Sequence, residues 1–77
     1  MKLIISDNNK KELLSTETLK EAYEFLQEQV PNQYLNPINI IRNAIYYDKR
    51  KEKQKSHFAF YLDKTEKNYI HLEVCYE

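Results

Sequence analysis

Four residues in the C-terminal part of the chain carry side chains suited to catalysis or metal binding: His57, His71, Glu73 and Cys75. A cysteine beside a histidine can form a nucleophile–base pair, and both side chains are preferred ligands of zinc. The two C-terminal segments read as antiparallel strands, and we expect Asp63 to pair with Tyr69 around their loop. In that register His57 lies opposite Cys75 on the outward face of the sheet.

The same register limits this chemistry. Structural zinc takes four ligands, and His71 would lie two pairs along the strands from His57 and Cys75. The chain contains no glycine, which excludes a glycine-lined oxyanion hole and the glycine-based phosphate loops of the Walker and dinucleotide types. We therefore expect no catalytic residue, no metal and no cofactor.

The run KRKEKQK at residues 49–55 places five positive charges in seven residues. Lysines at the tip of a two-stranded ribbon can contact a nucleic-acid backbone while tyrosines stack on bases. This candidate nucleic-acid site consists of Lys49, Arg50, Lys51, Lys53, Lys55 and Tyr46. The alternative is a solvated hairpin tip whose lysines keep a sheet edge from pairing. Glu52 within the run and a formal net charge of zero favour that alternative.

A row of glutamates, which we call the acidic row, recurs at spacings of 4, 3 and 4: Glu17, Glu21, Glu24 and Glu28. On a helix these carboxylates lie within about 60° of one another, opposite a predicted apolar stripe. They can imitate a phosphate backbone and occupy a basic groove on a partner, or they form an ordinary solvated face. Tyr23 and Phe25 flank the row, as aromatic residues do at protein contacts.

Seven tyrosines in 77 residues exceed the usual share of roughly 3% more than twofold. Tyrosine is rigid and amphipathic, so exposed tyrosines such as Tyr61 and Tyr69 on the outward sheet face can anchor a partner. This composition favours a binding protein but identifies no partner.

The apolar pattern predicts the elements that position these residues. Residues 2–6 form a β-branched strand, and residues 15–30 form an amphipathic helix capped by Ser15 or Thr16 and ended by Pro31. Asn36 and Pro37 start a short second helix over residues 37–44, a segment whose isoleucines fit a strand equally well. Residues 44–50 are predicted as a second strand.

The last two segments form a β-hairpin. Phe58, Phe60 and Leu62 alternate with polar residues, and the following strand alternates from Tyr69 to the C-terminus, Glu77 included. Asn68 is the expected left-handed residue of the loop between them. We predict an α+β fold, one small domain over residues 1–77 in the order β-α-(short α)-β-β-β, with an antiparallel sheet and one amphipathic helix packed on one face.

The N-terminal segment is too short in apolar residues for a signal sequence or membrane span, and a single cysteine allows no internal disulfide. We expect a cytoplasmic protein.

Two segments of the chain carry local charges of opposite sign. Residues 17–30 carry four glutamates against Lys20, whereas residues 42–55 carry six basic side chains against two acidic ones.

These observations favour a small non-enzymatic module that binds another protein through the acidic row or the tyrosine-bearing sheet face. Small size, an A+T-type composition and the acidic row suggest a phage- or mobile-element-type inhibitor that blocks a host nucleic-acid-processing or defence enzyme. Two alternatives stay open. One is a nucleic-acid-binding accessory protein that uses residues 49–55, and the other is a homodimeric structural module joined through the first or second predicted strand. No membrane partner is expected.

Overall fold

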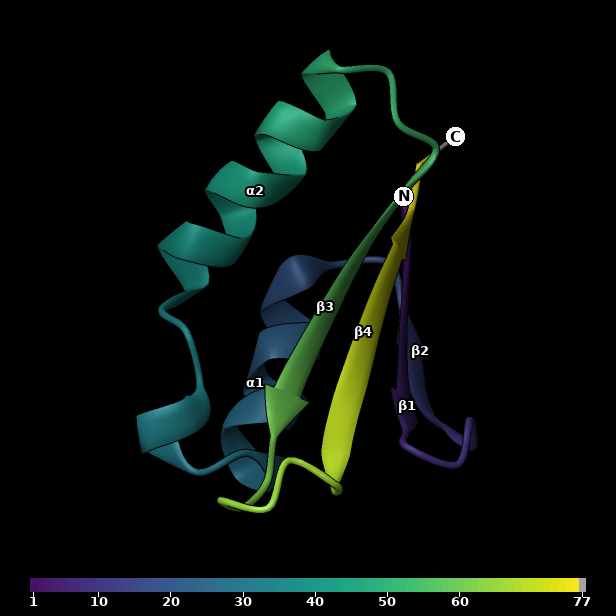
Figure 1. Cartoon of the computed structure of the whole chain (residues 1–77). Coiled ribbons are helices and arrows are strands. Elements are labelled where there is room, and N and C mark those ends of the chain that lie inside the picture. Colours follow the sequence, from purple (N-terminus) through teal and green to yellow (C-terminus); the bar gives the residue numbers. More distant parts are fainter. Residues whose placement is uncertain (77) are drawn as a thin grey trace.

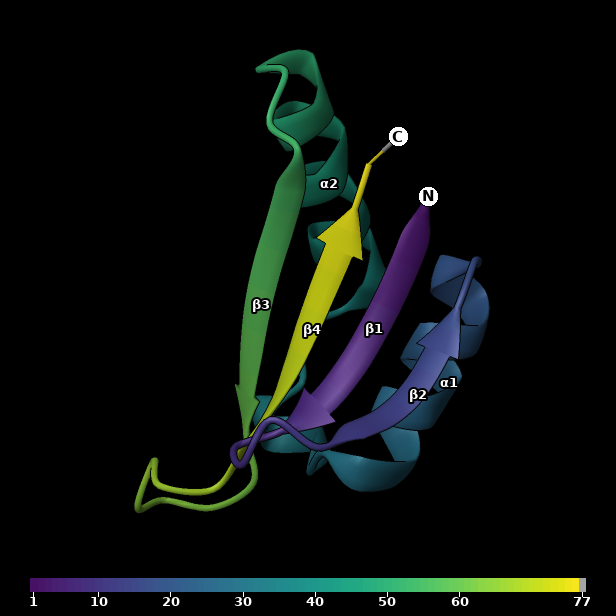
Figure 2. The ribbon, with the colours of Figure 1, turned by 90° about the vertical axis from the view of Figure 1, so that its right-hand side faces the viewer.

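The computed structural model describes residues 1–76 as a four-stranded antiparallel sheet with both helices on one face (Figure 1). Along the chain the elements are β1 (Lys2–Asp7), β2 (Glu12–Thr16), α1 (Leu19–Gln29), the 3-10 turn η1 (Asn32–Tyr34), α2 (Ile38–Arg50), β3 (Lys55–Tyr61) and β4 (Tyr69–Cys75). The strand order is β2-β1-β4-β3. Figure 2 views the sheet from the side that no helix covers, which we call the open face. Glu77 lies outside the described residues.

The predicted α+β class is confirmed, but the predicted order of elements is wrong at two places. The first is β2, which was not predicted. Residues 12–16 pair antiparallel with β1, so Ser15 and Thr16 belong to a strand and do not cap a helix. The cap is Thr18, whose side chain accepts a hydrogen bond from the backbone N–H of Glu21. Val30 ends α1 directly before Pro31, as predicted.

The second difference is α2, since residues 44–50 form a helix and not a strand. Pro37 is the N-cap residue and Asn36 does not cap the helix with its side chain. The helix then continues for 13 residues because Ile41 and Ile45, one turn apart, both fit under the sheet. Isoleucine and tyrosine favour strands locally, but this tertiary packing overrides their propensity.

The run at residues 49–55 is consequently not a hairpin tip. Lys49 and Arg50 form the last turn of α2, and the residues after them lead into β3. Glu52 adopts a left-handed conformation with φ 61° at this reversal. Basic side chains at the C-terminal end of α2 also interact favourably with its dipole.

The predicted β3–β4 hairpin is confirmed, with a different register. Tyr61 pairs with Tyr69, and His57 therefore pairs with Glu73 and not with Cys75, which lies opposite Lys55. In the loop it is Glu66 that is left-handed, with φ 60°, and not Asn68. The predicted alternation holds, because Phe60, Ile70, Leu72 and Val74 point into the core.

The core lies between the sheet and the two helices. Leu3 and Ile5 of β1 and the inward residues of β4 pack against Ala22 and Leu26 of α1. Ile41 and Ile45 of α2 complete the core on the side of β3. Neither helix within residues 1–76 has the length and apolar content needed to cross a membrane.

Candidate functional site

The four predicted reactive residues lie on the open face, where the two histidines contact each other. The rings of His57 and His71 stack with centroids 5.2 Å apart, and Nδ1 of His57 lies 3.2 Å from Nε2 of His71. At that distance one nitrogen donates a hydrogen bond and the other accepts it. Within residues 1–76 no group of three or more histidine, cysteine or acidic side chains is placed to hold a metal ion.

Cys75 sits beside an acidic group and not beside a base. Its thiol donates to a carboxylate oxygen of Glu73 at 3.3 Å, and Lys55 Nζ lies 3.0 Å from the same oxygen. The hydrogen bond to Lys55, followed by the one from Cys75, lowers the pKa of the Glu73 carboxyl. Burial and the bond to Glu73 raise the pKa of Cys75. This direction is opposite to that of an activated cysteine nucleophile.

The contact between His57 and His71 should make the free energy of unfolding depend on pH. Burial, followed by the charge of His57, lowers the pKa of His71 from its ordinary 6.5. The folded state therefore binds fewer protons than the unfolded chain, and the free energy of unfolding falls as the pH drops below 6.5. We expect His71→Gln to flatten this fall between pH 6.5 and 5, measured by urea unfolding at several pH values.

The carboxylates contribute in a separate, more acidic range. The pKa values of Asp48 and Asp63 are lowered mainly by hydrogen bonds from Ser56 and Thr65, respectively. The stability that these groups contribute is lost only as the pH falls below their ordinary value of 3.8. An unchanged slope between pH 6.5 and 5 in the His71→Gln protein would contradict the assignment to the histidine pair.

A polar cluster missed by the sequence analysis joins α2 to the two C-terminal strands. The Ser56 hydroxyl lies 2.5 Å from a carboxylate oxygen of Asp48 and also contacts the Tyr76 hydroxyl, while Lys53 pairs with Asp48 at 3.3 Å. Ser56 is only 2% exposed, so it is closed to a substrate, and we assign the cluster a structural role. Its only signal in the sequence is a serine at an inward position of an alternating strand.

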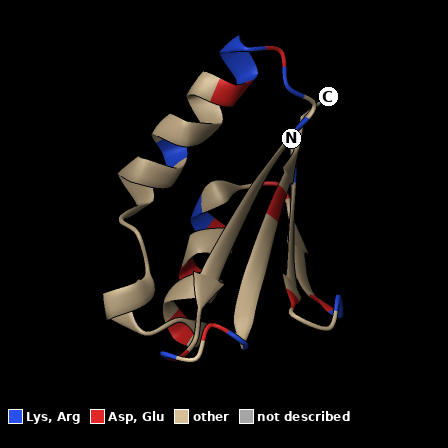
Figure 3. Cartoon of the chain, in the orientation of Figure 1, with Lys and Arg blue, Asp and Glu red and all other residues tan. Residues whose placement is uncertain are grey.

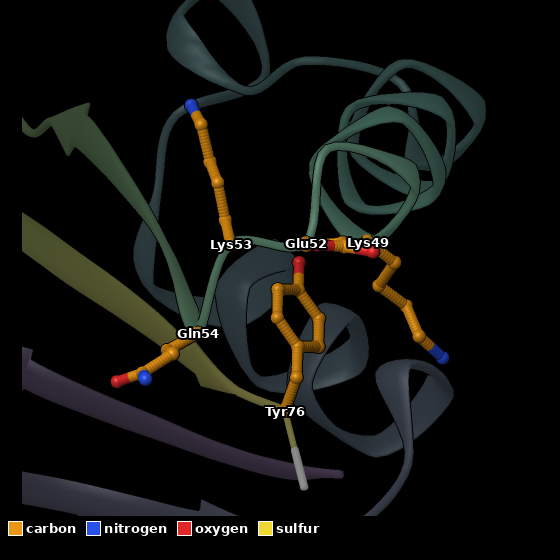
Figure 4. Close-up of a pocket in the computed structure, with 5 residues that line it drawn as sticks. All are labelled: Lys49, Glu52, Lys53, Gln54 and Tyr76. Atoms are coloured by element: carbon orange, nitrogen blue, oxygen red, sulfur yellow. The ribbon is translucent and has the colours of Figure 1, made fainter.

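A pocket of about 260 Å³ lies over this cluster and is lined by Lys49, Glu52, Lys53, Gln54 and Tyr76. In Figure 4 the two lysine side chains extend in opposite directions, and Lys49 Nζ lies over the Tyr76 ring, 5.8 Å from its centroid. Their ammonium groups therefore do not converge on one point, as an anion site requires.

The candidate nucleic-acid residues are only partly free. Lys53 is paired with Asp48 and Lys55 with Glu73, which offsets two of the charges. Arg50 lies over the ring of Tyr46 at 5.8 Å, and this tyrosine is 55% exposed. Lys49, Arg50 and Lys51 remain together at the C-terminal end of α2 and the residue after it, where Figure 3 shows the concentration of blue.

The acidic row is exposed on α1 and just before it. Glu21 is bonded to the last residue of β2, because its carboxylate accepts a hydrogen bond from the Thr16 hydroxyl at 2.9 Å. Glu24 and Glu28 have no hydrogen-bond or salt-bridge partner within residues 1–76. They are four residues apart, so they repel each other, and Glu28 lies in the last turn, where the helix dipole disfavours negative charge.

The predicted aromatic contacts of the row are not free anchors. Tyr23 and Phe25 are half-buried against the core, and the Tyr23 hydroxyl donates to the backbone oxygen of Asn36 at 2.8 Å. Tyr61 and Tyr69 instead meet edge to face on the open face, with centroids 6.5 Å apart. Of the four aromatic residues predicted to contact a protein partner, Tyr61 and Tyr69 are the two that lie on the open face.

Comparison with protein-family models, curated proteins and solved structures gives no match for this chain.

Proposed function

We propose that this protein is a non-enzymatic module that binds a basic surface of another protein through the acidic row. The single observation that carries the proposal is the placement of Glu24 and Glu28. These carboxylates are exposed and unpaired within the described chain, and Glu28 in the last turn is opposed by the helix dipole. Charge that does not help its own helix is well placed to attract a partner of opposite sign.

The more specific form of the proposal is an inhibitor of the phage or mobile-element type. A straight row of carboxylates along α1 can occupy a groove that normally holds the phosphate backbone of a nucleic acid. Its target would then be a host nucleic-acid-processing or defence enzyme. The tyrosine pair lies on the open face, on the side of the sheet opposite α1, and offers a separate contact surface, since tyrosine adds binding area at low entropic cost.

The experiment is affinity capture of the tagged protein from cell lysate, with and without nuclease, followed by mass spectrometry. We expect a near-stoichiometric protein that survives nuclease treatment and elutes with salt, because exposed charge pairs are screened. The captured protein should also lose binding to its nucleic acid when the module is added. A captured protein without nucleic-acid activity would remove the inhibitor form but leave the binding module.

The alternative is a nucleic-acid-binding accessory protein that uses the basic end of α2. It is supported by Lys49, Arg50 and Lys51 with Tyr46 beside them, and weakened by the ion pairs of Lys53 and Lys55. If this alternative holds, capture is lost on nuclease treatment. Substituting Lys49, Arg50 and Lys51 by alanine would then reduce the salt dependence of binding to single-stranded DNA.

A further inference from the structure

Strand β3 forms an outer edge of the sheet (Figure 2). Leu62 N donates to Asn68 O and Tyr76 N donates to Gln54 O, both at 2.9 Å. Because hydrogen bonds in an antiparallel pair alternate, the backbone N–H and C=O groups of the even-numbered β3 residues point toward β4. Those of the odd-numbered residues point away from the sheet edge. The outward N–H and C=O groups belong to Lys55, His57, Ala59 and Tyr61, and they have no backbone partner in the described chain.

This edge lacks the features that normally keep edge strands apart. Residues 56–61 carry no formally charged side chain and no proline, and β3 pairs with β4 without a bulge. The opposite edge, β2, is shorter, starts at Glu12 and is interrupted by a register shift. The two edges are therefore not equivalent, and β3 is the one open to strand pairing.

An apolar groove of about 120 Å³ runs between this edge and α2. Ile40 and Ala44 line it from the helix, and Phe58 and Ala59 line it from the strand. Tyr47 lies two helical turns after Ile40, on the same stripe of α2. Ile40 is 52% exposed and Tyr47 is 58% exposed, so this stripe presents two large apolar side chains to solvent beside the groove.

From these observations we propose that β3 and α2 form the interface of a symmetric homodimer with one continuous eight-stranded sheet. A two-fold axis through the groove pairs β3 antiparallel with β3 of the second copy. The same axis passes near the middle of α2, because Ala44 and Ala59 line the same groove. It therefore brings Ile40 of each copy against Tyr47 of the other, with the small side chain of Ala44 at the crossing.

The charges and the area agree with a second copy as the occupant. Lys55 is the only formally charged residue of β3, and Glu73 pairs with it in each copy, so two β3 edges meet without unbalanced charge. We expect the paired strands and the two α2 stripes together to bury on the order of 1,000 Å², the lower bound for a specific interface. We expect a dissociation constant in the micromolar range.

Sedimentation equilibrium and amide hydrogen exchange, both as a function of concentration, test the proposal. We expect a monomer–dimer equilibrium. The amide protons of His57, Ala59 and Tyr61 should become protected as the dimer forms, whereas those of Phe58 and Phe60 are protected already in the monomer. This alternation along one strand separates strand pairing from any other mode of association.

Two variants locate the interface. Ala59→Pro removes an outward N–H without removing a bond to β4, and Tyr47→Glu places charge in the helix contact. Each should weaken dimerisation at least tenfold. The controls are Ala59→Val, which keeps the N–H, and Tyr46→Glu, since Tyr46 is 55% exposed but lies on another side of α2. Both controls should change the dissociation constant less than threefold.

A protein that stays monomeric at millimolar concentration would overturn the proposal, as would a dimer insensitive to Ala59→Pro and Tyr47→Glu. The proposal would also be overturned if the monomeric protein captured an extended segment of a different protein at this edge and Ala59→Pro abolished that capture.

The proposal is independent of the acidic row. Substitutions of Glu24 and Glu28 should leave dimerisation unchanged, and Tyr47→Glu should leave capture by the acidic row unchanged.

Discussion

Replacing Ile45 by alanine should lower the free energy of unfolding by about 2–4 kcal/mol, because the removed atoms leave a cavity between α2 and the sheet. Ile45 is 6% exposed and packs in the core with Ile41. A domain of this size has a total stability of roughly 5 kcal/mol, so the variant should unfold near or below 37 °C. Urea unfolding followed by circular dichroism measures the change.

The two following residues provide matched controls. Tyr46→Ala and Tyr47→Ala should each change the free energy of unfolding by less than about 0.5 kcal/mol at concentrations where the protein is monomeric. In a strand, Ile45 and Tyr47 would share one face and both substitutions would be costly. A large loss from Tyr47→Ala as well as from Ile45→Ala would therefore contradict the helix.

The same residues show why the sequence predicts some elements and not others. In β4 every second residue is buried, so the alternation of Ile70, Leu72 and Val74 is legible without the structure. In α2 the local signals conflict, since isoleucine and tyrosine favour strands while Ile41 and Ile45 keep helical spacing. Packing of α2 against the sheet decides between helix and strand, and the local sequence pattern does not contain this information.

The short strand β2 was missed for a different reason. Its residues run directly into the helix cap, and Ser15, Thr16 and Thr18 are all acceptable cap residues. Pairing with β1 decides among them, because Thr16 lies opposite Leu3 and so remains in the sheet. The predicted hairpin register is wrong for a similar reason. The local sequence does not show that Glu66 takes the left-handed conformation expected for Asn68.

Of the candidate surfaces, the acidic row was the most predictable. Helical spacing alone predicts the exposure of Glu21, Glu24 and Glu28 on α1, whereas Glu17 precedes the N-cap Thr18 and so lies outside the helix, contrary to the prediction. The basic run could not be placed from sequence, because it lies at the end of a helix that was predicted as a strand. The ion pairs of Lys53 and Lys55 with Asp48 and Glu73 depend on that placement.

Reversing the charges of Glu24 and Glu28 to lysine should weaken binding to the captured partner at least 100-fold, or about 2.7 kcal/mol. The same change should alter the free energy of unfolding by less than about 0.5 kcal/mol, because two positive charges four residues apart repel as the two carboxylates do, while the positive charge in the last turn of α1 interacts favourably with the helix dipole. Titration calorimetry with the partner and urea unfolding measure the two quantities. A large loss of binding without a loss of stability distinguishes a binding role from a structural one.

The matched control is the double variant Glu12→Lys and Glu66→Lys, which changes the net charge by the same amount at exposed sites away from α1. If both double variants weaken binding equally, the partner responds to net charge and not to the row. If neither does, the acidic row is a solvated helix face and the open face becomes the surface to test. A loss of binding confined to the α1 variant, in a protein whose stability is unchanged, assigns these carboxylates to recognition and not to folding.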